Sequence, residues 1–413
     1  MPEEGSFGSS LWSVLSSKLG ADVIRSGISL PSWMYEPLSI LQRQAEMIEH
    51  ASTLDDAAKC EDSIDQLAFV AGFAVSAYSA TQRYRPSFNP MLGETFEYID
   101  ETNNVRFFAE QVSHHPPVSA FHSDRPNEWI FWQNSSPTTK FLGNSLDLDT
   151  HGNSHLYFHG TQNHFYYTNP CTRVHNIILG SMWIEHYGLL DIKSTNGSLS
   201  CIVNFKQSGY FFQGTQYQID GFIFHKDGKK LVKLEGRWDT QLTGTWLVDT
   251  PTTKAGETKL LWKNVTKPII QPEYNFTPFT ASLNDCNEIM EKVLLPTDSR
   301  RRLDRLFLQN GDTDNATQWK KVMEETQRTD RKNRNTDQWD PVWFKPSDQD
   351  ADKNLWVYVG GHWEQREERL KLVTEGKECG DAFPKAICGL ACDFLNYPVR
   401  PSLLHDSHAF KKD

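Results

Sequence analysis

The sequence lacks the cysteine patterns of disulfide-linked and zinc-binding proteins. Its 413 residues include seven cysteines, an odd number, and no pair has the Cys-x-x-Cys spacing. The cysteines therefore predict reduced thiols in a cytoplasmic protein, with no metal site and no disulfide framework. No apolar run approaches the roughly 20 residues that cross a bilayer, and Glu3 and Glu4 replace a basic flank at the N-terminus, so we expect a soluble chain.

An excess of positive charge is also missing. The formal net charge of −11 disfavours non-specific binding to nucleic acid. Neither Gly-x-Ser-x-Gly nor His-Glu-x-x-His occurs, which argues against a hydrolase and predicts a protein that is not an enzyme and needs no cofactor. Residues 300–334 reverse the charge balance with ten Lys/Arg against six Asp/Glu. This basic island is either a face for anionic lipid or a solvated helix.

Aromatic residues are abundant, at 12% of the chain, and favour a β-rich body with a wide apolar interior. Between residues 84 and 268, short alternating or apolar segments are separated by turns such as Asn196-Gly197 and Asp227-Gly228. So many strands predict a large antiparallel sheet that closes on itself and leaves a cavity. The predicted strands are 96–99, 105–111, 129–133, 145–148, 155–159, 165–168, 173–179, 183–187, 189–194, 200–205, 216–224, 231–238 and 245–248.

Helical periodicity appears on both sides of this region. Residues 7–24 place apolar side chains at steps of four, which indicates an amphipathic helix. Residues 62–81 are apolar nearly all round, so this helix must be buried on several sides. Further helices are expected at 36–51, 284–294, 300–309 and 315–334, and short aromatic strands within 339–363.

Two adjacent histidines, His114 and His115, precede Pro116 and Pro117. Neighbouring side chains on a strand point to opposite faces, but the prolines should end or kink the strand and turn both rings toward one pocket. Such a pair suits an anion such as phosphate. The alternative is one core histidine and one surface histidine.

A second cluster lies in the basic island. Lys320, Glu324 and Arg328 are four residues apart, which places them on one face of a helix. They form either a salt-bridge ladder on an exposed helix or a binding face.

Several strings together resemble the lipid-binding domain of the oxysterol-binding-protein family. They follow the family order across about residues 10 to 370. They include Glu-Gln-Val-Ser-His-His-Pro-Pro at 110–117, Ala-Gly-Phe-Ala-Val-Ser-Ala-Tyr-Ser at 71–79, Phe-Asn-Pro-Met-Leu-Gly-Glu-Thr at 88–95, Trp-Ile-Glu-His-Tyr-Gly at 183–188, Leu-Pro-Thr-Asp-Ser-Arg at 295–300 and Glu-Glu-Thr-Gln-Arg at 324–328.

The resemblance implies an α+β fold in which a large, nearly closed antiparallel β-barrel encloses a lipid tunnel. Residues 1–35 would form a lid, with Leu11, Trp12, Leu15 and Leu19 facing the lipid. Residues 36–82 would be bracing helices, 83–270 the barrel, 271–370 a C-terminal helical and mixed subdomain, and 371–413 a tail.

The resemblance also implies a function. The protein would be a non-vesicular lipid-transfer protein that exchanges phosphatidylinositol 4-phosphate for a second lipid, expected to be a sterol. Alternatives are a phosphatidylserine carrier, and a sensor or scaffold that binds the same ligands without net transport. We expect a monomer in the cytoplasm that contacts organelle membranes peripherally, including endoplasmic reticulum contact sites.

By the same resemblance, His114 and His115 take the 4-phosphate. Lys320 and Arg328 would donate further hydrogen bonds to the phosphates, and Glu324 would accept from inositol hydroxyls. These roles suit the donors and acceptors that the side chains carry.

One position departs from the family pattern. Relatives carry a lysine three residues before Asn89, where this chain has Pro86. Arg85 is the candidate replacement, although arginine and lysine are not interchangeable where geometry matters. Asn89 and Leu92 are predicted neighbours of the headgroup.

Overall fold

A single sheet of 14 antiparallel strands forms the body of the molecule. The structure, a computed structural model, describes residues 20, 22, 30–208, 216–265, 274–333, 340–347, 355–379 and 382–383. The strands are β1 (Thr95–Asp100), β2 (Val105–His114), β3 (Pro117–Arg125), β4 (Trp129–Phe141), β5 (Ser145–His151), β6 (Ser154–Phe158), β7 (His164–Thr168), β8 (Cys171–His175), β9 (Trp183–Ser194), β10 (Leu199–Phe205), β11 (Gln218–His225), β12 (Lys230–Arg237), β13 (Gln241–Trp246) and β14 (Thr258–Lys263).

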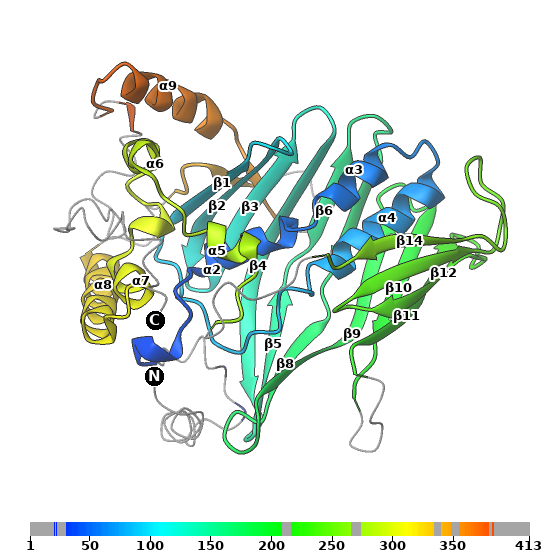
Figure 1. The fold of residues 1–413 in the computed structure, drawn as a ribbon, viewed down its shortest axis with the longest axis horizontal. Coiled ribbons are helices and arrows are strands. Elements are labelled where there is room, and N and C mark those ends of the chain that lie inside the picture. Colours follow the sequence, from blue (N-terminus) through cyan, green and yellow to red (C-terminus); the bar gives the residue numbers. More distant parts are fainter. Residues whose placement is uncertain are drawn as a thin grey trace.

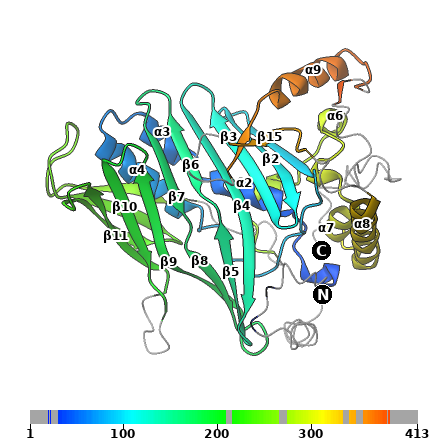
Figure 2. The same ribbon diagram turned by 180° about the vertical axis from the view of Figure 1, so that it is seen from behind.

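Two long strands, β4 and β9, each pair with three other strands. One half of β4 pairs with β6 and the other half with β5, while β9 pairs with β7, β8 and β10. Strands β4, β5, β8, β9, β7 and β6 therefore form a ring of hydrogen-bonded neighbours within the curved sheet (Figures 1 and 2). The predicted fold class, a large antiparallel and nearly closed sheet with helices, is confirmed.

Two of the observed strands were not predicted, and two of the predicted strands form a single strand in the structure. β3 begins at Pro117, the second of the two prolines that were expected to end the strand, because the chain reverses there and pairs with β2. β14 is the other addition. Predicted strands 183–187 and 189–194 are continuous as β9, with Gly188 at φ 101° between them.

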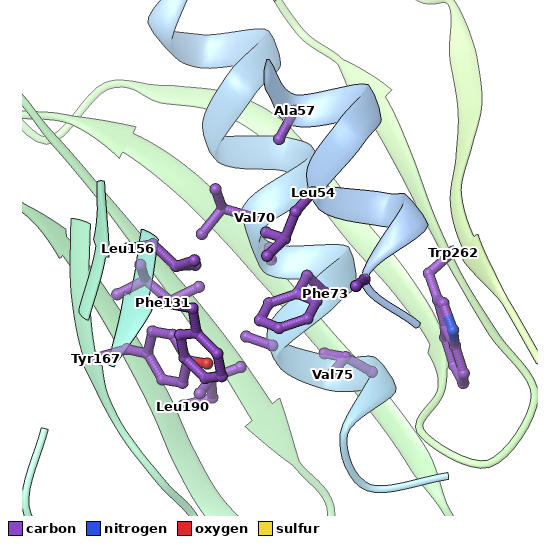
Figure 3. Packing of buried hydrophobic residues seen from close by; sticks show 14 of the residues in the cluster. Leu54, Ala57, Val70, Phe73, Val75, Phe131, Leu156, Tyr167, Leu190 and Trp262 are labelled. Atoms are coloured by element: carbon purple, nitrogen blue, oxygen red, sulfur yellow. The ribbon is translucent and has the colours of Figure 1, made fainter. Parts of the chain in front are cut away.

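Helix α4 (Ser63–Ser76) lies against the concave side of the sheet, as its apolar sequence predicted. Asp62 caps its N-terminus by accepting from two backbone N–H groups. Figure 3 shows Val70 and Phe73 facing residues of the opposite strands, and Phe73 meets Phe131 edge to face at 5.1 Å between ring centroids. At Gly72 an added Cβ would approach the Leu261 carbonyl oxygen to 3.0 Å, so glycine permits the close packing of α4 on β14.

The helix predicted over 36–51 is broken. It forms α2 (Ile40–Ala45) and a 3-10 turn, η3 (Glu46–Ile48), and α3 (Ser52–Ala58) begins just beyond it. η2 (Ser32–Met34) precedes it. Helix α2 packs on β1 and β2, while α3 pairs with α4 (Figure 2).

Helices follow β14 in the chain, and all but the first of them gather at one side of the sheet (Figure 1). They are α5 (Pro278–Ser282), α6 (Glu288–Val293), η4 (Ser299–Arg301), α7 (Leu303–Gln309), α8 (Thr313–Asn333) and α9 (His362–Thr374). The predicted aromatic strands are confirmed as β15 (Phe344–Pro346) and β16 (Trp356–Tyr358). Trp363, expected in a strand, lies in α9, and α9 also runs across the predicted start of the tail at residue 371.

Most of the predicted lid, including Leu11, Trp12, Leu15 and Leu19, lies outside the described residues. Of that segment, Gly20 donates its N–H to the Phe141 carbonyl at 2.7 Å, and Asp22 accepts from the Thr139 hydroxyl at 3.0 Å. In the described part of the chain, no helix has both the length and the apolar character needed to cross a membrane.

Candidate functional site

The two histidines lie at the tip of the β2–β3 hairpin. β2 ends at His114, β3 begins at Pro117, and these two residues are paired across the hairpin, so His115 and Pro116 form the turn. The imidazole rings meet edge to face with centroids 4.8 Å apart. Both line a cavity of about 610 Å³, which we call the basic cavity. The prediction that both rings face one pocket is therefore confirmed.

The opposite wall of the basic cavity is helix α8. The Lys320 ammonium lies 2.7 Å from one Glu324 carboxylate oxygen, and the Arg328 guanidinium lies 3.3 Å from the other. All three side chains line the cavity. The predicted salt-bridge ladder is thus present, and it lies on the face of α8 that lines the basic cavity.

Stacked aromatic rings support these cations. The Lys320 ammonium lies 5.2 Å from the centroid of the Tyr35 ring, and Tyr35 stacks on Phe88 at 4.8 Å. The Arg302 guanidinium lies 5.3 Å from the centroid of the Phe88 ring and also pairs with Asp304 and Glu94. The cation–π contacts therefore add to the ion pairs that hold Lys320 and Arg302 at the cavity wall.

Both histidines are driven toward the neutral form. Burial, then His115 and Arg331, lower the pKa of His114 to about 4, with Glu324 acting in the opposite direction. Burial and Arg331 also lower the pKa of His115. The Nδ1 atom of His114 is buried and has no hydrogen-bond partner among the described residues. A ligand in the basic cavity can supply that partner.

Sequence reasoning missed three lining residues of α8. Met323, Gln327 and Arg331 also face the basic cavity. The helical spacing contained the signal, because Gln327 and Arg331 lie three residues beyond Glu324 and Arg328. Arg331 adds a third cation from α8 to the cavity wall, and it lowers the pKa of both histidines.

Glu110, in the same motif as the histidines, has a structural role. Its carboxylate accepts hydrogen bonds from the backbone N–H groups of Val342 (2.9 Å) and Trp343 (3.0 Å). Burial raises the pKa of Glu110 to about 7, against the effect of these hydrogen bonds. It thus fixes the segment before β15 onto β2.

A second cavity of about 380 Å³, the inner cavity, adjoins the first. Tyr35, Ile40, Asn89 and Pro137 line both. Most of its surface is apolar, with side chains that include Met47, Ala77, Leu146, Leu148, Val174, Ile177, Met182 and Ile184. The molecule therefore offers a charged compartment next to an apolar one.

A buried histidine lies in the wall of the inner cavity. The His186 ring is held by the hydroxyls of Thr81 at 2.6 Å and Thr172 at 2.9 Å. Burial, with a smaller effect from Arg43, lowers the pKa of His186 to about 3. The wall is therefore polar but uncharged at this point.

The remaining predicted residues are dispersed. Asn89 is exposed and lines both cavities. Arg85 and Pro86 line the inner cavity but not the basic cavity, and the Arg85 guanidinium donates to the Trp33 carbonyl at 2.7 Å. Leu92 is half-buried and lines neither. The structure thus brings the histidines and the α8 triad together, but not Arg85 or Leu92.

No group of three or more His, Cys, Asp or Glu side chains in the described part of the chain is placed to hold a metal ion. The five described cysteines, Cys60, Cys171, Cys201, Cys286 and Cys379, are not in disulfides.

Comparison with known proteins defines the family of this chain and the class of its fold. The model of the oxysterol-binding protein family matches residues 10–367, so the chain belongs to that family. It is 36% identical to oxysterol-binding protein 11 of Dictyostelium discoideum over 89% of this chain and 64% of that protein. It is 33% identical to human oxysterol-binding protein-related protein 1 over 86% of this chain and 42% of that protein. In both comparisons the chain spans less than two thirds of the relative.

Solved structures share the fold. The Osh1 ORD domain in complex with cholesterol has a TM-score of 0.79 and 34% identity, over 87% of this chain and 89% of that one. The Osh3 ORD in complex with PI(4)P from Saccharomyces cerevisiae has a TM-score of 0.73 and 33% identity, over 87% and 93%.

Proposed function

We propose that this chain binds phosphatidylinositol 4-phosphate and a sterol in turn and carries them between membranes. The observation that carries the proposal is the buried Nδ1 atom of His114, which has no hydrogen-bond partner among the described residues. It lies in a cavity lined by Lys320, Arg328 and Arg331, next to an apolar cavity. A phosphorylated headgroup matches the first compartment, and acyl chains or sterol rings match the second.

Binding alone can drive this exchange. Each methylene that moves from a bilayer into the inner cavity keeps its apolar surroundings, whereas exposure to water would cost about 0.8 kcal/mol. The basic cavity then distinguishes headgroups, and no covalent step is required. Relatives with bound cholesterol and bound PI(4)P support both ligands. We further propose a monomer that works at cytoplasmic membrane surfaces, including endoplasmic reticulum contact sites.

The test is extraction of phosphatidylinositol 4-phosphate from liposomes by the intact protein and by His114→Ala/His115→Ala. Hydrogen bonds to charged groups contribute about 1.5–3 kcal/mol each, so we expect the double substitution to lower extraction by roughly tenfold or more. His151→Ala/His159→Ala, at two exposed positions outside both cavities, is the control and should extract normally. If the intact protein extracts none, the proposed ligand is wrong, and phosphatidylserine and sterol become the ligands to test.

A further inference from the structure

Two exposed leucines lie on neighbouring loops at the end of the sheet where β4, β5 and β8 meet. Leu142 follows β4 and is 38% exposed, while Leu179 lies between β8 and β9 and is 79% exposed. Figures 1 and 2 show these strands converging at the lower tip of the molecule, away from β14. We call residues 141–145 and 176–182 the leucine tip.

Asn144 joins the two loops. Its side-chain oxygen accepts from the backbone N–H groups of Ile178 and Leu179, both at 3.0 Å. Its side-chain nitrogen donates to the Leu179 carbonyl at 3.0 Å, and its backbone carbonyl accepts from Ile177 at 3.2 Å. One residue of the β4–β5 loop therefore holds most of the other loop in place.

Further hydrogen bonds complete the leucine tip. The Leu142 N–H donates to Ser145 at 2.8 Å, and the Asn176 side chain donates to the Ser181 carbonyl at 3.0 Å. Neither segment contains a charged residue. These bonds pair several backbone groups of the two loops, and a paired group costs less to bring to the apolar edge of a bilayer than an unpaired one. In ordinary exposed loops, many backbone N–H and C=O groups form hydrogen bonds with water instead.

The leucine tip is also continuous with the inner cavity. Ile177 and Met182 of the same loop line that cavity, and Ile177 packs with Met34 and Phe141. The loop thus has one apolar side toward the cavity and another, with Leu179, toward solvent. A lipid bilayer in contact with Leu179 would lie next to the wall of the compartment.

We propose that the leucine tip docks on a lipid bilayer by inserting Leu142 and Leu179. The choice of a bilayer as the partner rests on the proposed function, because the ligand of the inner cavity would come from that bilayer. Insertion is apolar, so docking should persist at high salt, unlike docking through a basic patch.

The test is flotation with phosphatidylcholine vesicles, without and with 0.5 M NaCl, for the intact protein and for Leu142→Asp/Leu179→Asp. We expect the double substitution to lower the bound fraction at least fivefold in both salts. Leu260→Asp, on β14 and 52% exposed, is the matched control and should bind as the intact protein does. Equal binding by the double variant, or an equal loss in the control, would overturn the proposal.

Two further readouts separate the alternatives. Binding of water-soluble, short-chain phosphatidylinositol 4-phosphate should be the same in the double variant and the intact protein, which shows that the variant is folded. If neither the intact protein nor the double variant binds the short-chain lipid, but vesicle docking still depends on the two leucines, the proposed function is wrong and membrane docking by the leucine tip is supported. If sedimentation shows a dimer that the double substitution dissociates, the leucine tip is an interface between copies and the proposal is wrong.

Discussion

Glu324 holds two cations on the face of α8 that lines the basic cavity. The Arg328–Glu324 pair is solvent-exposed and contributes only about 0.3–0.5 kcal/mol, so stability does not account for this pair. Lys320 is moreover 6% exposed and lies over the Tyr35 ring. A carboxylate between two cations lowers their mutual repulsion at the wall of the basic cavity.

When both histidines are neutral, helix α8 presents three cations to the basic cavity, Lys320, Arg328 and Arg331, and one anion, Glu324. An anionic headgroup would balance the excess of cations. A phosphate near His114 also favours its protonated form, so binding opposes the effect of burial on its pKa.

His186 should make stability depend on pH. Its folded-state pKa of about 3 lies below the unfolded value of roughly 6.5, so the unfolded state binds the proton first. Its contribution is complete above pH 6.5 and is lost as the pH falls toward 3. Lowering the pH from 7.5 to 5.5 should reduce the free energy of unfolding of both proteins, and we expect the reduction to be about 1.4 kcal/mol smaller in His186→Gln than in the intact protein. Urea denaturation at both pH values measures this, and an unchanged difference would contradict the assignment.

Helix α4 is fixed to the sheet by one buried carboxylate as well as by apolar packing. Asp65 accepts from the indole N–H of Trp246 at 2.7 Å and from the hydroxyls of Thr250 (3.0 Å) and Thr252. Asp65→Ala leaves these donors unpaired, so we expect the free energy of unfolding to fall by about 3 kcal/mol. Chemical denaturation measures the loss.

Asp56→Ala on the neighbouring helix α3 is the control for Asp65→Ala. The Asp56 side chain is 55% exposed and pairs with Lys59 at 3.0 Å, so its removal should change stability by less than about 0.5 kcal/mol. Similar losses in the two variants would show that the Asp65 hydrogen bonds do not anchor α4.

Strong local patterns in the sequence predicted α4, most strands and the shared face of Lys320, Glu324 and Arg328. The sequence could not show that α8 faces His114, because about 200 residues separate them and only the tertiary fold joins them. It did not show the break at Glu46 either, because the apolar spacing continues through it. Nor did residue order reveal that Arg85, next to the position of the expected lysine, faces the inner cavity.

For the molecule as a whole, we propose that the two cavities form one lipid-binding site. They share Tyr35, Ile40, Asn89 and Pro137, and the charged compartment adjoins the apolar one. A headgroup in the basic cavity would therefore place its acyl chains in the inner cavity. A sterol in the inner cavity would occupy the same space, so the two ligands should exclude each other.

The most direct test of a single shared lipid site is the displacement of a bound fluorescent sterol by phosphatidylinositol 4-phosphate. The protein is loaded with dehydroergosterol and mixed with vesicles that contain the phosphoinositide, while both lipids are quantified. We expect one sterol to be released for each phosphoinositide bound, and His114→Ala/His115→Ala to retain its sterol. Simultaneous binding of both lipids, or phosphoinositide binding without sterol release, would contradict a single shared site.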